Sequence, residues 1–364
     1  MQPAPAPRKG GVVWKILTVL FCVLFCIVSF AYFVSFVTHS LTPTGRQTFE
    51  KEHQLEETVI ESKSSDNKIA VIPIEGVITS GNMERSSMNL VEFVTEQLKA
   101  AKKDDDVKAV ILKVNSPGGE VLASDDINAA IAKFQTESKK PVITSMGTLA
   151  ASGGYYVSAP TRWIVANKLT ITGSIGVIMH GYNYRGLMDK VGVRPETYKS
   201  GKFKDMLSGD QEPDLDKLSS EDRENREEEK RMVQNLINET YGSFKDIVKQ
   251  GRGRAHDLNK KDGHALVDDW EDYADGRVFS GKQALDLGFV DELGDFNVAV
   301  ARAKKLANIG EANLIEYKSP VDLSLLFRLL SKTEAPALKI ELGMDLPKLE
   351  AGRMYYMTPT VLPH

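Results

Sequence analysis

Short apolar runs alternate with stretches of helical periodicity through the middle of the chain. Ile69–Ile74 (IAVIPI) and Val107–Val114 (VKAVILKV) have the length of buried strands, and Met88–Lys102 between them has apolar residues at helical spacing. This order predicts a strand, a helix and a parallel strand. Two further strands and two helices are predicted at Pro141–Met146, Trp163–Ala166, Ser124–Phe134 and from about Ala150. The pattern therefore predicts an α/β domain with a largely buried sheet.

A longer helical pattern follows the predicted sheet. Apolar residues recur at spacings of three and four from Met232 to Val248, directly after the highly charged stretch Glu221–Arg231. We interpret both stretches as one long helix whose first half faces solvent. A docking surface is the alternative for the charged half, but a solvated helix face explains mixed charges without any partner.

An uncharged apolar run, Ile16–Val37, lies near the N-terminus. Its 22 residues would measure about 33 Å as a helix, which is enough to span a bilayer. A cleaved signal peptide is the alternative, but its apolar region is shorter and ends in small residues, whereas this run ends among Phe and Tyr. Three basic residues precede the run, and the next one after it is Arg46. The positive-inside rule therefore places the N-terminus in the cytoplasm and the remaining chain outside.

These patterns divide the chain into five parts. We predict a cytoplasmic N-terminus at 1–15, a transmembrane helix at 16–37, a linker at 38–68, a folded domain at 69–332 and a C-terminal tail at 333–364. The linker is polar, with mixed charges, although Phe49–Val59 within it is also compatible with a short helix. Four prolines make the tail irregular, and the apolar, aromatic stretch Met354–Met357 lies near its end.

Composition narrows the possible functions. The 364 residues include 46 Lys and Arg against 50 Asp and Glu, and this balance argues against a dedicated nucleic-acid-binding protein. Both cysteines, Cys22 and Cys26, lie in the N-terminal apolar run, so the folded domain offers neither a catalytic thiol nor a zinc-thiolate site. The six histidines are scattered without ligand spacing, and the usual dinucleotide, P-loop and zinc-protease motifs are absent. We therefore expect no metal and no cofactor.

Three glycine-bearing turns follow or join predicted strands. Asn115–Gly119 (NSPGG) carries two glycines that leave backbone N–H groups uncovered. Gly147–Gly154 (GTLAASGG) places Ser152 near a helix start among small residues, and Thr172–Ser174 precedes another apolar run. Singly, each is an ordinary turn or a helix cap. Together they predict a serine nucleophile that faces an oxyanion hole.

A serine nucleophile needs a base. A lysine can serve when burial makes it neutral, and the segment Lys199–Asp205 (KSGKFKD) offers three lysines. The rival is His180, which follows Ser152 by 28 residues, as a Ser-His arrangement would allow. Spacing alone leaves both choices open.

Four strings carry a resemblance to a known family. In chain order they are NSPGG at 115–119, MGTLAASGGYYVSA at 146–159, TGSIGVIM at 172–179 and SGKFKD at 200–205. Together they resemble the signal peptide peptidase A family, S49, of membrane-anchored bacterial Ser-Lys peptidases. The later strings DGRVFSG at 275–281 and GFVD at 288–291 resemble it too, and the similarity runs from about Ile69 to Leu306. One anchor and one peptidase unit are similar to the short, single-repeat form.

The resemblance implies both a fold and a set of site residues. The implied fold is crotonase-like or ClpP-like, with repeated ββα units. The implied catalytic residues are the nucleophile Ser152, the general base Lys204 and Ser174, which would orient the Lys204 amine. The implied oxyanion hole is made by the backbone N–H of Gly153 with that of Gly118 or Gly119. The motif context around Lys204 favours it over His180.

The implied activity is hydrolysis of remnant signal peptides and other apolar peptides outside the bacterial cytoplasmic membrane, without a cofactor. The family also implies a homo-oligomeric ring or dome in which neighbouring subunits complete the sites. Substrate contacts are expected from Gly119–Ala123, a segment that would pair with an extended peptide through Glu120, Val121 and Leu122. A tail beside such an enzyme is expected to dock on a neighbouring subunit or to be cut by the enzyme itself.

Two other functions remain possible on the same fold. An acyl-CoA hydratase-like enzyme would not need an external, anchored domain, because CoA substrates are cytoplasmic. An inactive membrane scaffold would not need Ser152, Lys204 and Ser174, and all three are present. Both alternatives are therefore less favoured than the peptidase.

Overall fold

The computed structural model describes two separate units of the chain. In the N-terminal unit it describes residues 17, 19–25, 27–30 and 32, all of them helical, and in the second unit residues 55–81, 88–319 and 354–357. The predicted N-terminus, parts of the predicted transmembrane helix and most of the predicted linker and tail lie outside these residues. Among the described residues, no helix combines the length and the apolarity that crossing a bilayer requires.

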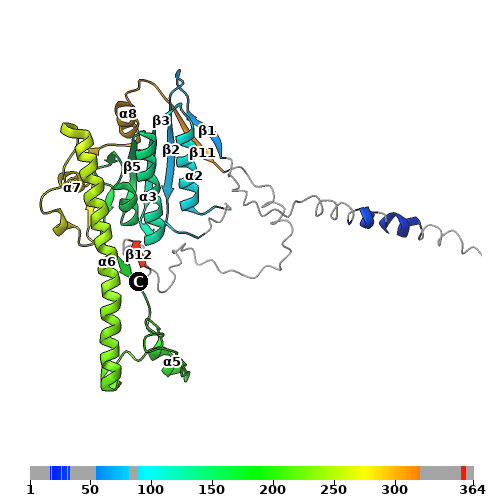
Figure 1. Ribbon diagram of the computed structural model, residues 1–364, viewed down its shortest axis with the longest axis vertical. Helices are drawn as coiled ribbons and strands as arrows, with labels where there is room; N and C mark the ends of the chain where they lie inside the picture. The colour runs from blue at the N-terminus through cyan, green and yellow to red at the C-terminus, as the bar shows by residue number, and fades with distance from the viewer. Residues whose placement is uncertain are drawn as a thin grey trace, which may run out of the picture. The chain divides into compact units, whose positions relative to one another are not determined.

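A nine-stranded mixed sheet forms the body of the second unit (Figure 1). Its strands are β1 Glu56–Glu61, β2 Lys68–Glu75, β3 Val107–Ser116, β5 Val142–Ala151, β6 Trp163–Ala166, β7 Ile171–Gly173, β9 Val278–Ser280, β10 Glu292–Leu293 and β11 Asn313–Lys318. The order is β1-β11-β2-β3-β5-β6-β10, and β7 pairs with β5 and β9. The pairs β1–β11 and β7–β9 are antiparallel, and all the other strand pairs of this sheet are parallel.

Helices cover both faces of this sheet. They are α2 Leu90–Lys103, α3 Val121–Ser138, α4 Gly153–Ser158, α5 Arg185–Val191, α6 Ser220–Asn259, α7 Gly281–Asp286 and α8 Phe296–Leu306. Three short 3-10 helices lie at Leu215–Lys217, Lys260–Asp262 and Trp270–Tyr273. Side chains of β2 alternate between two apolar cores: Ile72 packs with residues of α2, α3 and α6, whereas Ile69 packs with Ala299 and Ala303 of α8. Burial on both faces explains why the strands appear in the sequence as continuous apolar runs.

The α/β class predicted from the sequence is confirmed. The predicted strand, helix and strand at the start of the domain are β2, α2 and β3, and the long helix with a charged first half is α6. Asn89 starts α2 through a capping box, because its side chain accepts from the Glu92 N–H (2.9 Å) and Glu92 accepts from the Asn89 N–H (3.1 Å).

Two elements differ from the prediction. The edge strand β1 lies within the predicted linker, so the folded domain begins before residue 69. Its side chains are mostly exposed, and an exposed edge strand leaves little apolar signal in the sequence. The apolar run Ile175–Met179 forms only the two-residue strand β8, Ile178–Met179.

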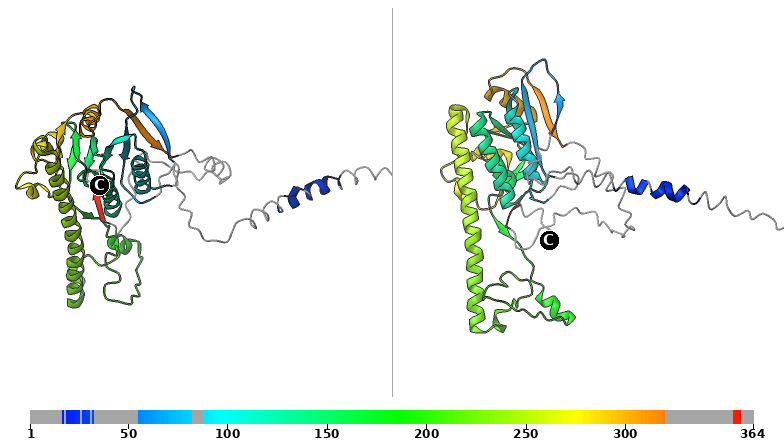
Figure 2. Two further views of the ribbon diagram at one scale, coloured as in Figure 1. Left: turned by 45° about the horizontal axis from the view of Figure 1, so that its top comes forward. Right: turned by 45° about the vertical axis from the view of Figure 1, so that its right-hand side comes forward.

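Helix α6 is anchored at one end and projects from the body at the other (Figures 1 and 2). Near its C-terminal end, Arg252 makes a fully buried ion pair with Asp291, which also accepts from the Ile164 N–H (2.8 Å). At 40 residues the helix is about 60 Å long, which is longer than the sheet it packs against.

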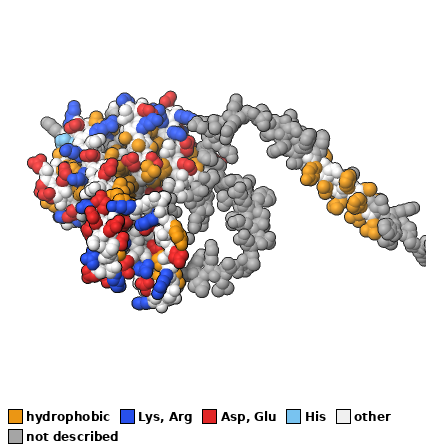
Figure 3. Space-filling view, turned by 60° about the horizontal axis from the view of Figure 1, so that its bottom comes forward, with side chains coloured by type: hydrophobic (Ala, Val, Ile, Leu, Met, Phe, Trp, Pro, Cys, Tyr) orange, Lys and Arg blue, Asp and Glu red, His pale blue; other side chains and the backbone are white. Residues whose placement is uncertain are grey.

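The segment 180–219 forms an arm along the N-terminal half of α6 (Figure 1). Gln211 of the arm accepts hydrogen bonds from Asn183 (2.9 Å) and from Arg226 of α6 (2.6 Å). Large apolar side chains of this arm are exposed, namely Tyr182, Tyr184, Leu187, Val191, Val193, Tyr198, Leu207 and Leu215. Figure 3 shows such side chains, in orange, among the charged ones at this end of the molecule.

Candidate active site

Ser152 occupies the sharp turn between β5 and α4. Its backbone is in a strained conformation, with φ 55° and ψ −118°. The residue is 1% exposed, and its Oγ has no hydrogen-bond partner among the described residues. It makes no side-chain cap bond to α4, so its hydroxyl is not used as a helix cap. A buried, unpartnered hydroxyl on a strained turn fits a nucleophile better than a structural serine.

Ser174 lies beside this turn because β7 pairs with β5. Ala151 faces Gly173 in that pairing, and the Ser152 N–H donates to the Gly173 carbonyl (2.7 Å). Ser174 is also buried, has φ 51° and donates its N–H to the carbonyl of Arg277 (2.8 Å). The Arg277 guanidinium pairs with Asp275, and this hydrogen bond lowers the pKa of Asp275 to about 2. The Asp275–Arg277 ion pair, in the turn whose carbonyl accepts from Ser174, therefore persists at any ordinary pH.

The two glycines of NSPGG form the strand β4, Gly118–Glu120. Gly118 has φ +99°, and a Cβ atom there would lie 2.6 Å from the Gly153 nitrogen, so only glycine fits this position. The Gly118 N–H donates to Ser116 Oγ (3.1 Å). That amide is therefore engaged within the turn, and the Gly119 nitrogen lies close to Gly153, 3.1 Å from the position of a Cβ atom there.

The C-terminal tail completes a second, three-stranded sheet at this site. Its strand β12, Met354–Met357, lies between β4 and β8 and is antiparallel to both. Tyr356 faces Gly119, and its carbonyl oxygen would be 1.9 Å from a Cβ atom on Gly118. The described part of the tail, Met354–Met357, thus pairs with strands of its own chain, while docking on a neighbouring subunit and cutting of the tail stay predictions. An extended peptide thus lies beside the Ser152 turn with a carbonyl directed at the glycine segment.

Only part of the predicted substrate segment pairs with this strand. Glu120 pairs with Tyr355, but Val121 and Leu122 begin α3 and line a cavity beside β12 instead. Pairing ends at Glu120 because a helix cannot continue the ladder of a strand.

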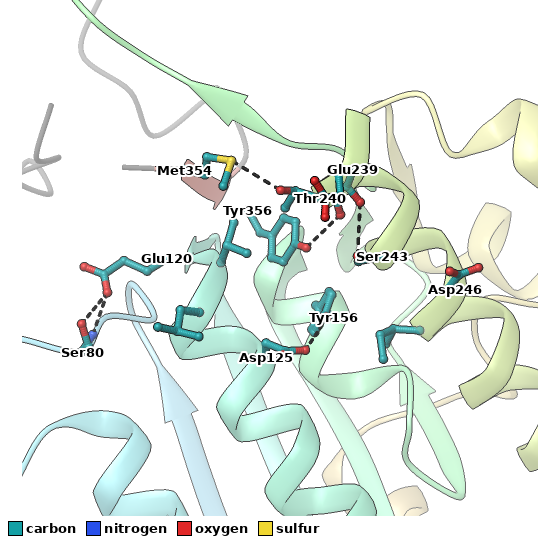
Figure 4. A pocket seen from close by; sticks show the side chains of 13 residues that line it. Ser80, Glu120, Asp125, Tyr156, Glu239, Thr240, Ser243, Asp246, Met354 and Tyr356 are labelled. Atoms are coloured by element: carbon teal, nitrogen blue, oxygen red, sulfur yellow. Dashed lines mark hydrogen bonds between the residues drawn. The ribbon is translucent and has the colours of Figure 1, made fainter. Parts of the chain in front are cut away.

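Tyr356 fills an aromatic pocket that the sequence did not reveal. Its ring stacks on Tyr156 (centroids 4.8 Å apart) and contacts Phe244 of α6 (centroids 4.7 Å apart). Its hydroxyl donates to the Thr240 carbonyl (3.2 Å) (Figure 4). Burial raises the pKa of the Tyr356 hydroxyl, so the side chain is neutral. The sequence signals for this pocket were the aromatic stretch Met354–Met357 near the end of the tail and the Tyr155-Tyr156 pair after the nucleophile turn, and no pattern joined the two.

In the described part of the chain, no hydrogen bond joins Lys204 to Ser152, to Ser174 or to the glycine segment. Lys204 is exposed on the arm, where its backbone N–H donates to the Gly201 carbonyl (3.1 Å). The rival base His180 is also exposed, and its ring packs edge-on against Tyr182. One chain therefore brings together Ser152, Ser174 and the glycines, but not the base.

Comparison with known proteins places this site in a family. A protein of Enterococcus faecium with the provisional name signal peptide peptidase SppA is 37% identical over 283 residues, 76% of this chain and 75% of that protein. The family model described as Peptidase family S49 matches residues 134–310. The chain belongs to peptidase family S49. It is therefore a serine peptidase.

Two further S49 relatives differ in length. A protein of Synechocystis sp., provisionally named a protease, is 37% identical over 71% of this chain and 82% of its own length. Protease 4 of Haemophilus influenzae is 32% identical over 76% of this chain, which is only 42% of its own length. The S49 unit present here thus corresponds to less than half of that longer relative.

Proposed function

We propose that this S49 peptidase is a membrane-anchored Ser-Lys endopeptidase that degrades remnant signal peptides and other apolar peptides. The observation that carries the proposal is β12, an extended peptide held between β4 and β8 beside Ser152. Main-chain pairing with both strands accepts peptides of many sequences, and the buried pocket around Tyr356 suits an apolar side chain. Substrates of this kind are released at a membrane after secretion.

The proposed reaction uses Ser152 as nucleophile and Lys204 as base. The neutral lysine amine takes the proton from Ser152 Oγ, and the oxygen attacks the carbonyl at the Tyr356 position. The N–H groups of Gly119 and Gly153 stabilise the resulting oxyanion. The lysine then protonates the leaving amine, and water hydrolyses the acyl-enzyme. Ser174, next to the nucleophile turn, would orient the lysine amine.

Lys204 would come from a neighbouring subunit of a ring or dome. This assignment is supported by its exposed place on the arm and by the unusual exposure of apolar side chains there. A heterologous contact, in which the arm of one copy reaches the Ser152 turn of the next, closes into such a ring. The sheet and the site turns are compatible with the crotonase-like fold that the family resemblance implies.

The anchor is proposed from the sequence. The uncharged run Ile16–Val37 is long enough to span a bilayer, and the basic residues before it would hold the N-terminus in the cytoplasm. The peptidase domain would then act outside the bacterial cytoplasmic membrane.

A synthetic signal peptide tests the proposed activity. Ser152→Ala is expected to lower kcat/KM for its cleavage by a factor on the order of 10⁴ or more, because no other group replaces the nucleophile. The matched control is Ser138→Ala, at the far end of α3, which should cleave like the wild type. Cleavage by the Ser152→Ala variant at the wild-type rate would refute the proposal.

The tail offers a second test, in which the substrate is the chain itself. The peptide bond after Tyr356 has its carbonyl at the glycine segment, so we expect the wild type to lose residues 357–364. Intact-mass measurement should find this loss in the wild type but not in Ser152→Ala. A full-length mass in both proteins, or trimming that persists in Ser152→Ala, would contradict self-cleavage.

A further inference from the structure

A cavity of about 860 Å³ opens beside β12 and is not filled by the docked tail (Figure 4). Two tail side chains line it, those of Met354 and Tyr356, on the same face of the strand. Helix α6, which both side chains contact at Thr240, forms another part of the wall. Because Met354 and Tyr356 occupy the positions of substrate residues under the proposed function, any substrate would direct two alternate side chains into this cavity.

The charged side chains that line the cavity are all acidic. Four carboxylate residues line it, Glu120, Asp125, Glu239 and Asp246, and none of its described lining residues is Lys, Arg or His. Glu120 accepts from the Ser80 hydroxyl (2.6 Å), and Asp125 accepts from the Tyr156 hydroxyl (2.6 Å). The Asp246 carboxylate interacts with the neighbouring Lys245 ammonium and contributes to its raised pKa. Glu239 makes no ion pair within the described ranges, so its carboxylate is the one available to a ligand.

The docked strand shows which substrate position is nearest to the Glu239 carboxylate. Met354 contacts α6 through its sulfur, which lies 3.4 Å from Thr240 Oγ1, and Thr240 directly follows Glu239. Figure 4 shows Glu239 next to this contact. A lysine or arginine at the same position is longer than methionine. Its aliphatic stem would take the place of the Met354 side chain, and its cationic end would reach the carboxylates beyond Thr240.

We propose that this cavity selects peptides with a lysine or arginine two residues before the residue that enters the Tyr356 pocket, and that Glu239 is the specificity-determining residue. The inference rests on the proposed function, because it takes β12 as the stand-in for a substrate. The substrate class is then an apolar peptide with a basic residue, held by backbone pairing and selected by charge.

Binding to the full-length Ser152→Ala chain tests this selection without turnover. Three labelled peptides with the sequence of residues 350–360 would carry Lys, norleucine or Glu at position 354. The tail competes equally with all three, so their ratios of Kd are unaffected by it. We expect the Lys peptide to bind about fivefold more tightly than the norleucine peptide at low salt, and the Glu peptide to bind more weakly. Adding 0.5 M NaCl, roughly enough to screen beyond 4 to 5 Å, should remove most of the difference.

Two variants in the same background locate the effect. Glu239→Gln should bring the Lys-to-norleucine ratio close to one. Glu224→Gln makes the same charge change on α6 about 22 Å away and should leave the ratio as it was. The proposal would be overturned if the Ser152→Ala protein showed no preference for the Lys peptide over the norleucine peptide. It would also be overturned if Glu239→Gln left that preference unchanged. Wild-type cleavage of the norleucine peptide is a separate readout, which reports on the proposed function alone.

Discussion

Mixing the inactive variants Ser152→Ala and Lys204→Ala is expected to restore peptide cleavage. Alone, Ser152→Ala should lose activity by a factor on the order of 10⁴ or more, because it lacks the nucleophile, and Lys204→Ala by roughly 10³ or more, because it lacks the base. If Lys204 serves the serine of a neighbouring copy, a mixed ring contains contacts where an intact serine meets an intact lysine. In an equal, random mixture these are about a quarter of all contacts, so about a quarter of wild-type kcat is expected.

Three further variants make this result interpretable. Lys204→Arg should be as inactive as Lys204→Ala, because arginine stays protonated. His180→Gln should keep most of the activity. The mixture should also stay inactive when both parents carry Ser152→Ala. A mixture that forms mixed oligomers but cleaves nothing would exclude a catalytic base supplied by the neighbouring subunit. An active Lys204→Ala together with an inactive His180→Gln would exclude the Ser-Lys assignment.

Gly118→Ala is expected to reduce peptide cleavage at least about a hundredfold. The new methyl group would lie 1.9 Å from the carbonyl oxygen of a peptide in the β12 position and 2.6 Å from the Gly153 nitrogen. Both contacts are with backbone, which cannot move aside as a side chain would. Under the proposed function, the substitution therefore blocks the position of the scissile carbonyl and displaces one of the proposed oxyanion donors.

Gly76→Ala is the matched control for this variant. Gly76 has φ +73°, but a Cβ atom there meets nothing within 4 Å. Both substitutions strain the backbone by about 1–2 kcal/mol, and Gly118→Ala adds the two backbone clashes, so both should lower Tm and Gly118→Ala should lower it further; activities are therefore compared at a temperature well below both Tm values. Only Gly118→Ala should lose activity. Equal activities of the two variants in the peptide assay would show that the carbonyl position at Gly118 is not used.

The sequence predicted those features that depend on local pattern. The alternation of apolar runs and helical periodicity was sufficient for β2, α2, β3 and β6, because each buries residues in a regular register. The glycine turns were sufficient to single out Ser152 as a candidate nucleophile, whereas the role of Ser174 came only from the family resemblance; the pairing of β5 with β7 that puts the two turns side by side was seen only in the structure. The edge strand β1 was not predicted, since its side chains face solvent and need no apolar pattern.

Features that depend on distant segments were not predictable in this way. The Tyr356 pocket combines α4, α6 and a tail strand more than 100 residues further along the chain. No spacing rule relates such positions. The place of Lys204 is a similar case, because its motif suggests a catalytic role but contains no information about which copy of the chain it serves.

The tail strand also changes what a kinetic measurement on the intact chain would report. A ligand joined covalently to its own binding site acts at an effective concentration on the order of 1 mM, whatever the concentration of the protein. A free peptide has to displace this internal competitor. The measured KM of the peptide therefore exceeds its intrinsic KM by a factor of about the effective concentration of the tail divided by the dissociation constant of the tail. Affinity for its own sequence around Tyr356 thus sets the concentration of foreign peptide at which degradation begins.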